Sequence, residues 1–84
     1  MDKRFVYILR SESDPERHYI GVTSNVAIRL QLHNAGKNVH TYMNRPWRVV
    51  VTLEFPTQLG AYRFERYLKS GSGRAFAKRH FSLD

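Results

Sequence analysis

The stretch HYIGVTSNVAIRLQLHNAG, which runs from His18 to Gly36, is the most informative part of the chain because a strand pattern changes into a helix pattern without a long connection. Residues His18–Thr23 combine aromatic and β-branched side chains, as strands do. Ser24 or Asn25 can cap a helix that follows, and Gly36 suits the C-terminal stop of that helix. We therefore predict a strand that leads directly into a helix.

An earlier strand is predicted at Phe5–Leu9, a short run of apolar, aromatic and β-branched residues. The polar loop between the two strands is centred near Asp14, which predicts a hairpin in which Tyr7 lies opposite Gly21. Alternation then places Tyr7, Tyr19 and Gly21 on one face of the hairpin. Glycine is costly inside a strand, so we expect Gly21 to make room for the Tyr7 ring or for a ligand.

The predicted helix carries an apolar stripe and a polar pair. Val26, Leu30 and Ala35 lie roughly along the stripe. Arg29 and His33 are four residues apart, so their side chains are neighbours on one helix face. The helix can therefore present a permanent cation and a titratable base to the same place.

The rest of the chain predicts one more strand and two more helices. The last helix is expected at Gly73–His80 with Ser72 as its cap, and the helix before it begins after Thr57 and ends at Gly71. The strand is Trp47–Phe55, and simple alternation puts one set of side chains on one face: Trp47, Val49, Val51, Leu53 and Phe55. The order β-β-α-β-α-α fits an α+β layer architecture, which we expect to form one domain over residues 1–84.

The composition favours an anionic partner. The chain has 84 residues and a formal net charge of +7, with 14 Lys and Arg against 7 Asp and Glu, which points to nucleic acid. It has no cysteine, and its four histidines do not have zinc-ligand spacing, so thiolate and zinc-finger sites are excluded. No segment has the length of a membrane span or of a signal peptide, so we expect a cytoplasmic protein without a membrane partner.

Five residues can together form a phosphodiesterase site: Tyr7, Tyr19, Arg29, His33 and Glu65. Each of them alone has a structural explanation as a packing, boundary or surface residue. Phosphodiester hydrolysis needs an activated water, neutralised phosphate oxygens and help for the leaving oxygen. A carboxylate can hold a divalent cation, an arginine can bind phosphate oxygens, and a tyrosine whose pKa is lowered by such neighbours can accept a proton.

The order Phe5–Leu9, a polar loop, Tyr19-Ile20-Gly21 and then Arg29 resembles the GIY-YIG nuclease superfamily. Tyr19-Ile20-Gly21 matches the second element of that family letter for letter, and Tyr7 matches the tyrosine of the first element. Glu65 lies in FERYLK, where the metal-binding glutamate of the family falls. The resemblance covers nearly the whole chain and implies a three-stranded, mainly antiparallel sheet flanked by helices.

The resemblance is closest to the small, single-domain bacterial members, which are similar to the nuclease module of the excinuclease that acts in DNA repair. The segments HNAGK (His33–Lys37), RPWRVV (Arg45–Val50) and LKSGS (Leu68–Ser72) resemble that subgroup. The chain departs from the family at one point. Many family nucleases have an asparagine in the last helix, whereas no asparagine follows Glu65 here.

The resemblance implies a metal-dependent endonuclease. On this interpretation Glu65 binds one Mg²⁺ or Mn²⁺, and Arg29 stabilises charge in the transition state. Tyr7 or Tyr19 orients or deprotonates the attacking water, and His33 moves a proton or orients its neighbours. DNA is expected to be the substrate rather than RNA, with weak sequence specificity because little surface is left for reading bases. Four basic residues are expected to contact the nucleic-acid backbone: Lys37, Arg74, Lys78 and Arg79.

Two other interpretations of the sequence stay open. The scaffold could bind DNA or RNA through its basic face without turnover, with the absent asparagine as the mark of a decayed site. Alternatively, the chain could be a protein-interaction domain whose charge serves solubility. In that case Trp47, Phe76 and Phe81 would form an exposed patch.

Overall fold

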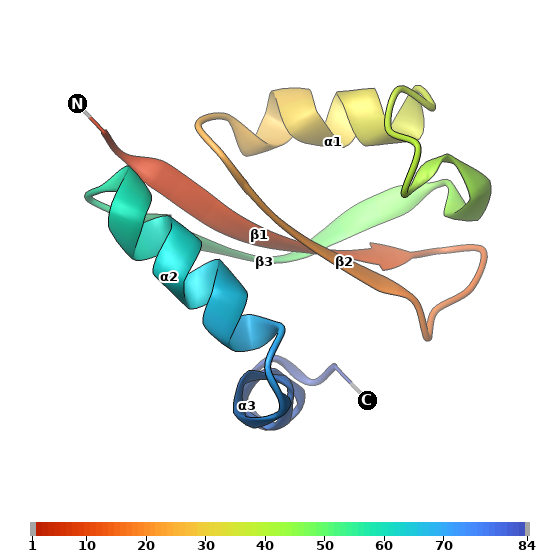
Figure 1. Ribbon diagram of the computed structural model, residues 1–84. Coiled ribbons are helices and arrows are strands. Elements are labelled where there is room, and N and C mark those ends of the chain that lie inside the picture. Colours follow the sequence, from red (N-terminus) through yellow and green to blue (C-terminus); the bar gives the residue numbers. More distant parts are fainter. Residues whose placement is uncertain (1, 84) are drawn as a thin grey trace.

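The computed structural model describes residues 2–83, which form a three-stranded antiparallel sheet with helices on both faces (Figure 1). The strands are β1 (Arg4–Ser11), β2 (His18–Thr23) and β3 (Trp47–Phe55), in the order β2-β1-β3 across the sheet. The helices are α1 (Val26–Asn34), η1 (Tyr42–Asn44, a 3-10 turn), α2 (Gln58–Leu68) and α3 (Gly71–Phe81). This architecture confirms the predicted α+β class and the predicted order of strands and α-helices.

The central strand β1 forms the core of the molecule. It pairs with a strand on each side, and Val6, Tyr7, Ile8 and Leu9 are all 0% exposed. Val6 and Ile8 pack with Leu68 on the face covered by α2 and α3, whereas Tyr7 and Leu9 point to the face covered by α1. The same strand therefore supplies the hydrophobic core on one face and a buried phenol on the other.

The hairpin between β1 and β2 has the predicted register. Tyr7 lies opposite Gly21, and Leu9 lies opposite Tyr19. The alternation of β2 also follows the prediction, because Ile20 packs on the α2 and α3 face while Tyr19 packs on the α1 face. The positions of the two tyrosines were thus predictable from local pattern alone.

Side-chain caps fix the starts of the first two helices. The Asn25 side chain accepts a hydrogen bond from the Ile28 amide at 3.1 Å, and the Thr57 hydroxyl accepts one from the Gly60 amide at 3.0 Å. Both caps were among the predicted ones. The predicted place of Ala35 on the apolar stripe of α1 is wrong, since this residue is exposed at the C-cap.

The side chains of β3 do not alternate regularly along the whole strand. The prediction that Trp47, Val49, Val51, Leu53 and Phe55 share one face is therefore wrong. Ile8 pairs with Val51, but the next residue, Leu9, pairs with Val49. The extra residue, Val50, makes a β-bulge, which reverses the alternation at that point. Trp47 and Val49 consequently face α1, whereas the residues after the bulge face α2 and α3.

The last helix begins earlier than predicted. Its cap is Ser70, whose hydroxyl accepts a hydrogen bond from the Gly73 amide at 3.1 Å, and the helix runs from Gly71 to Phe81. The predicted cap Ser72 is wrong, because Ser72 lies inside the helix. The early start fits the packing, since Gly73 is buried directly against the carbonyl of Tyr67 at the end of α2.

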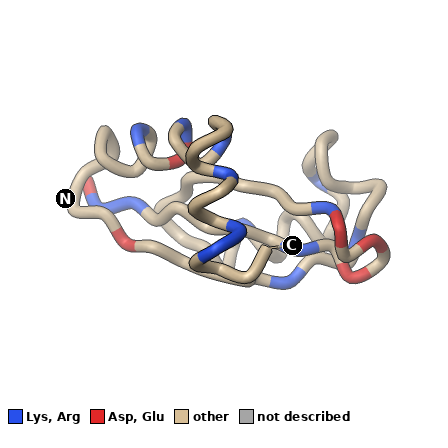
Figure 2. Tube along the Cα trace, turned by 90° about the horizontal axis from the view of Figure 1, so that it is seen from below, with Lys and Arg blue, Asp and Glu red and all other residues tan. Residues whose placement is uncertain are grey.

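Charge is distributed unevenly along the chain. Figure 2 shows acidic residues gathered in the loop between β1 and β2, where Glu12, Asp14 and Glu16 lie. Lys and Arg residues predominate over the remaining elements, so the positive net charge is carried by the rest of the molecule. Within residues 2–83, no helix combines the length and apolar character needed to cross a membrane.

Candidate active site

Tyr7 and His33 come from β1 and α1 and meet in the interior. The Tyr7 hydroxyl lies 3.0 Å from Nε2 of His33, and Nδ1 of His33 lies 2.8 Å from the hydroxyl of Thr41. Each of these three residues is at most 1% exposed. The indole N–H of Trp47 donates to the carbonyl of Thr41 at 2.8 Å, which holds the loop in place. Both ring nitrogens are thus bonded, so the orientation of the imidazole is fixed.

The second tyrosine completes an aromatic cluster around His33. The ring of Tyr19 lies 4.8 Å from the His33 ring and 6.3 Å from the Tyr7 ring, measured between centroids. Gly21 makes this arrangement possible, because a Cβ at this position would lie 2.6 Å from the Tyr7 hydroxyl oxygen. The structure therefore supports the prediction that Gly21 makes room for the Tyr7 ring.

Arg29 lies one helical turn before His33 and adds positive charge to this cluster. Its Nε atom is buried and has no hydrogen-bond partner among the described residues. A buried donor without a partner is uncommon, and a water or an anion can supply the acceptor. A small pocket of about 70 Å³ is lined by Arg29, Leu32 and His33 of α1 and by Lys37 and Asn38 of the loop that follows, so two cationic side chains border it.

Burial and the charge of Arg29 shift the pKa values of Tyr7 and His33. Burial raises the pKa of Tyr7, and the nearby Arg29 guanidinium only partly opposes this shift. Burial lowers the pKa of His33, and the positive charge of Arg29 lowers it further. For Tyr7, desolvation thus outweighs the charge of Arg29. A neutral phenol can donate to Nε2 of a neutral imidazole, whose Nδ1–H can then donate to Thr41.

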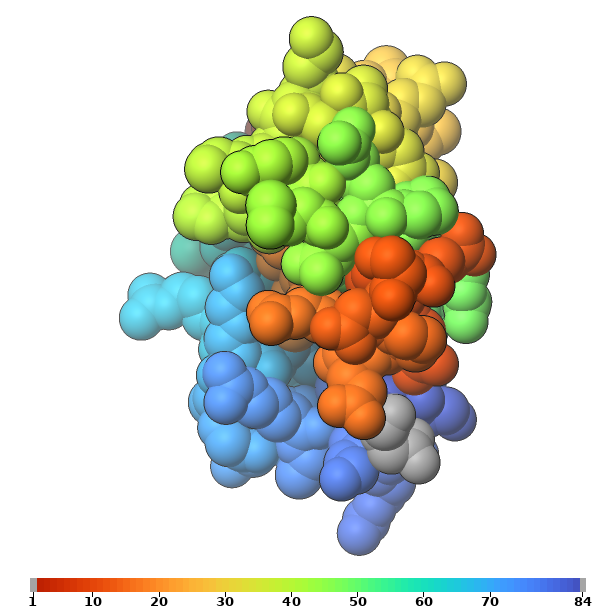
Figure 3. Space-filling model, turned by 90° about the vertical axis from the view of Figure 1, so that its right-hand side faces the viewer, coloured from red at the N-terminus to blue at the C-terminus, as the bar shows by residue number. Residues whose placement is uncertain are grey.

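A larger hollow lies next to this cluster, between the start of β2 and the helices α2 and α3. We call this hollow the β2–α3 groove. Its volume is about 700 Å³, and its lining includes Tyr19, Lys69, Arg74 and Lys78. Figure 3 shows the orange residues that precede β2 beside the blue residues of α2 and α3. Two of the predicted backbone contacts, Arg74 and Lys78, therefore share one groove, whereas Arg79 is exposed on α3 outside its lining.

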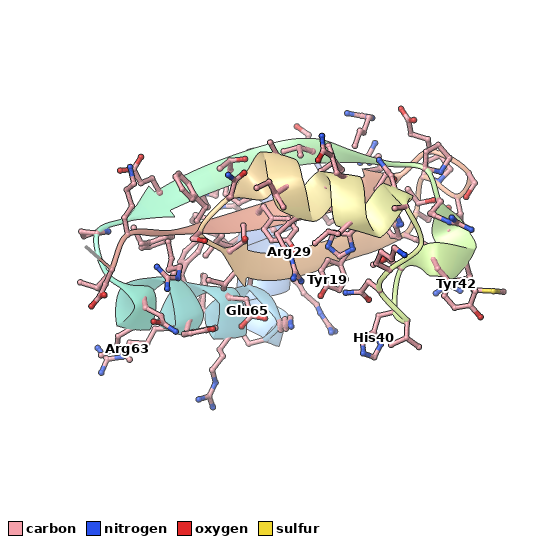
Figure 4. All side chains as sticks on the ribbon, turned by 90° about the horizontal axis from the view of Figure 1, so that it is seen from above. Tyr19, Arg29, His40, Tyr42, Arg63 and Glu65 are labelled. Carbon is pink, nitrogen blue, oxygen red and sulfur yellow. The ribbon has the colours of Figure 1, made fainter. Side chains whose placement is uncertain are left out.

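Glu65 lies on α2, the helix that covers the sheet face opposite to α1. Its side chain is 15% exposed and forms an ion pair with Lys69, one turn later, at 2.5 Å. In Figure 4 the labelled side chains of Tyr19, Arg29 and Glu65 occupy the same part of the view, whereas Arg63 lies nearer the start of α2. The structure thus brings Tyr7, Tyr19, Arg29 and His33 into one cluster, and Glu65 faces its cationic partner Lys69.

Comparison with known proteins agrees with this geometry. Residues 3–79 match the family model described as the GIY-YIG catalytic domain. The chain belongs to the GIY-YIG family. It is 36% identical over 73 residues to the UPF0213 protein SH2523 of Staphylococcus haemolyticus, covering 86% of this chain and 87% of that protein. The solution structure of the UPF0213 protein BH0048 of Bacillus halodurans has a TM-score of 0.57 and 32% identity, covering 98% of this chain and 85% of that one.

Fungal relatives of this GIY-YIG chain are longer. It is 37% identical over 86 residues to the structure-specific endonuclease subunit SLX1 of Candida dubliniensis, a match that covers 94% of this chain and 29% of that protein. The protein of the same name from Meyerozyma guilliermondii is 36% identical over 70 residues, with 76% and 24% covered. The chain therefore spans less than a third of the fungal proteins that it matches.

This GIY-YIG chain offers few side chains that could bind a divalent cation. Among residues 2–83, no group of three or more His, Asp or Glu side chains could hold a metal ion. Mg²⁺ usually keeps several waters and takes one or two protein carboxylates together with substrate phosphates. The nearly buried carboxylate of Glu65 fits that mode of binding, in which the remaining ligands are waters and phosphate oxygens.

Two residues of this site were not predicted. Thr41 follows an irregular polar stretch, and nothing in its sequence context indicates a partner eight residues earlier. Lys69 could have been found, because a Glu followed by a Lys four residues later is a common helical ion pair. The predicted exposed patch of Trp47, Phe76 and Phe81 is wrong, since Trp47 is 4% exposed and both phenylalanines pack partly buried against the core.

Proposed function

We propose that this chain is a divalent-metal-dependent endonuclease that hydrolyses phosphodiester bonds of DNA with weak sequence specificity. One observation carries the proposal. A neutral histidine, two tyrosines and an arginine with an unpartnered buried donor converge beside β2, in a chain of which residues 3–79 match a catalytic domain. Relatives named as structure-specific endonuclease subunits support the same class of reaction.

Arg29 is proposed to bind the scissile phosphate. Its unpartnered Nε can donate to a phosphate oxygen, and its permanent charge stabilises the extra negative charge of the transition state. Lys37 lines the same small pocket and can bind an adjacent phosphate oxygen. The +7 net charge of the chain attracts the polyanion towards this pocket.

Tyr19 is proposed to contact the attacking water, because it is partly exposed whereas Tyr7 is 0% exposed. In this assignment Tyr7 is a positioning residue, whose hydroxyl fixes the imidazole of His33. The His33 ring in turn packs against the Tyr19 ring, which holds the phenol in place. A phenol in this place can orient the water, and its phenolate form can take the proton of the water as a general base.

Glu65 is proposed to hold the divalent ion, Mg²⁺ or Mn²⁺, with Lys69 released from its carboxylate. When bound, such an ion supplies positive charge that stabilises the leaving oxygen of the phosphodiester. The carboxylate is nearly buried, so the chain itself supplies a site that shields the charge from bulk water.

The test is a cleavage assay with single-stranded, duplex and branched DNA, in Mg²⁺, in Mn²⁺ and in EDTA. Arg29→Ala and Glu65→Gln should each lower the rate by about 100-fold or more, as the loss of a transition-state charge partner does. Two matched controls, Arg63→Ala and Glu54→Gln, change exposed groups outside the cluster and should cut like the wild type. Equal rates for Arg29→Ala and Arg63→Ala, with both proteins folded, would refute the assignment.

A second candidate is a nucleic-acid-binding module without turnover. The ion pair between Glu65 and Lys69 favours it, because a carboxylate engaged by a lysine is not free to bind metal. The absence of an asparagine after Glu65 points in the same direction. Salt-dependent binding of DNA that Mg²⁺ does not alter, with no cleavage of any of the three substrates, would establish this function instead.

A further inference from the structure

The β2–α3 groove has two kinds of lining. The partly exposed aliphatic side chains of Ile20 and Leu83 line part of it, and the ring of Tyr19 borders them. Basic side chains come from the two helices, with Lys69 at the end of α2 and two further cations on α3, Arg74 and Lys78. An apolar surface beside a row of cations is suited to a ligand that carries both an apolar face and negative charges.

From this lining we infer that the β2–α3 groove binds an unpaired strand of nucleic acid, with its bases on the aliphatic surface and its phosphates on Lys69, Arg74 and Lys78. Bases of an unpaired strand expose faces that stack on apolar and aromatic side chains, and every base has such a face. The bases of a duplex are covered by their neighbours, so a duplex would use only the cations. This inference deepens the proposed function and rests on it, because it names the part of the substrate that lies next to the reacting phosphate.

The size of the groove agrees with a strand of one or two nucleotides in direct contact. Its volume is about 700 Å³, and pockets of about 300 to 1,000 Å³ hold one small organic molecule. The described molecule measures 31 × 29 × 17 Å, which leaves no channel wide enough for a double helix. A duplex could lie across the surface, but it could not enter this groove.

Two residues join the groove to the proposed active site. Tyr19 lines the groove and also packs against His33, so a strand in the groove would pass directly beside the cluster. Lys69 lines the groove and pairs with Glu65. A phosphate that attracts Lys69 would release the carboxylate of Glu65, so strand binding and release of the metal-binding group are coupled.

One acidic residue in the groove opposes this ligand and provides a second test. Glu16 lines the side of the groove formed by the loop before β2, and its charge repels a phosphate. Removal of this charge should therefore strengthen binding if the occupant is anionic. The same change should weaken binding if the occupant is a cationic peptide.

The experiment measures binding of the full chain to labelled oligonucleotides by fluorescence anisotropy in EDTA, where cleavage plays no part. The probes are a single-stranded DNA, an RNA of the same sequence and a blunt duplex DNA. The groove variant is Arg74→Ala with Lys78→Ala. The matched control is Arg63→Ala with Arg66→Ala, which removes the same charge from exposed positions of α2 outside the groove. Thermal unfolding verifies that both variants are folded.

We expect the groove variant to lose at least about tenfold in affinity for a single strand, and the slope of log K against log salt to fall by about 1.4 for two lost contacts. The control should lose much less affinity for a single strand, and Glu16→Gln should gain affinity. The DNA and RNA arms decide which strand is preferred. Equal losses for the groove variant and its control, or equal losses on single strand and duplex, would overturn the inference.

The outcome for the groove is separable from that for the proposed function. A wild-type chain that binds single strands through Arg74 and Lys78 but cuts nothing in Mg²⁺ would refute the nuclease and leave the groove inference intact. A chain that cuts DNA while its groove variant binds and cuts normally would refute the groove inference alone.

Discussion

A methyl group at Gly21 is the sharpest perturbation that the structure offers. The Cβ of an alanine at this position would lie 2.6 Å from the Tyr7 hydroxyl oxygen, 2.7 Å from Cζ and 2.9 Å from Cε1. Tyr7 is 0% exposed, so its ring has no open space on that side. The Gly21→Ala substitution must therefore displace the Tyr7 ring, and with it the hydrogen bond to His33 at 3.0 Å.

The expected cost follows from two effects. Overpacking a tight interior by one methyl group costs about 1–3 kcal/mol. A buried donor or acceptor that loses its partner costs about 1–3 kcal/mol, although a relaxed ring can recover part of this bond. We expect a loss of about 2 kcal/mol in the free energy of unfolding, which corresponds to about 8–16 °C in Tm for a domain of this size.

The assay is thermal and urea unfolding of Gly21→Ala beside a matched control, Gly71→Ala. A Cβ at Gly71 would meet no atom within 4 Å, so the control should be as stable as the wild type or up to about 1 kcal/mol more stable, because alanine favours the helix. In a Tyr7→Leu background, which removes the ring, the additional cost of Gly21→Ala should shrink by about 1 kcal/mol or more. If Gly21→Ala and Gly71→Ala have the same stability, the close approach to Tyr7 does not constrain the site and the reasoning fails.

Three further outcomes are expected. Thr41→Val should destabilise by about 1–3 kcal/mol, because it leaves Nδ1 of His33 without a partner, whereas Thr41→Ser keeps the hydroxyl and should restore most of the loss; equal urea midpoints for the two variants would contradict this. Burial lowers the pKa of His33 and of His18, so the unfolded chain takes up protons first as the pH falls below about 6.5. Stability should therefore decrease from pH 7 to pH 5.5, and His33→Gln should flatten that decrease; a slope unchanged by the substitution would show that His33 is not its source. Gly73→Ala should cost about 3 kcal/mol or more, since its Cβ would meet the carbonyl of Tyr67 and separate α3 from α2. A native-like circular dichroism spectrum and Tm would count against that packing.

Local patterns in the sequence predicted most of the fold. The register that sets Tyr7 opposite Gly21 follows from a short hairpin loop and period-two alternation. Thr57 was predicted as a cap, and Asn25 was one of two candidates with Ser24, because a short polar side chain before an amphipathic segment satisfies the free amides of a helix. These features depend on neighbours within a few residues, so they can be read from the chain itself.

Some features could not be predicted because they depend on groups distant in sequence. The bulge at Val50 depends on how β3 pairs with β1. No residue within the strand sequence itself predicts its position. The last helix was predicted to be capped by Ser72, whereas its cap is Ser70 and Gly73 packs against the end of α2. The hydrogen bonds of His33 join residues 26 positions before it and eight after it.

The order of residue types was enough to predict a basic α+β chain with two strand tyrosines, an arginine and a histidine one turn apart, and a later glutamate. The folded molecule was needed to learn that Tyr7 is buried and neutral, that Tyr19 stays accessible, and that Lys69 engages Glu65. This division arises because residue type and spacing fix which groups can share a face. Burial, hydrogen-bond partners and protonation are set by the whole packed interior, which no single segment contains.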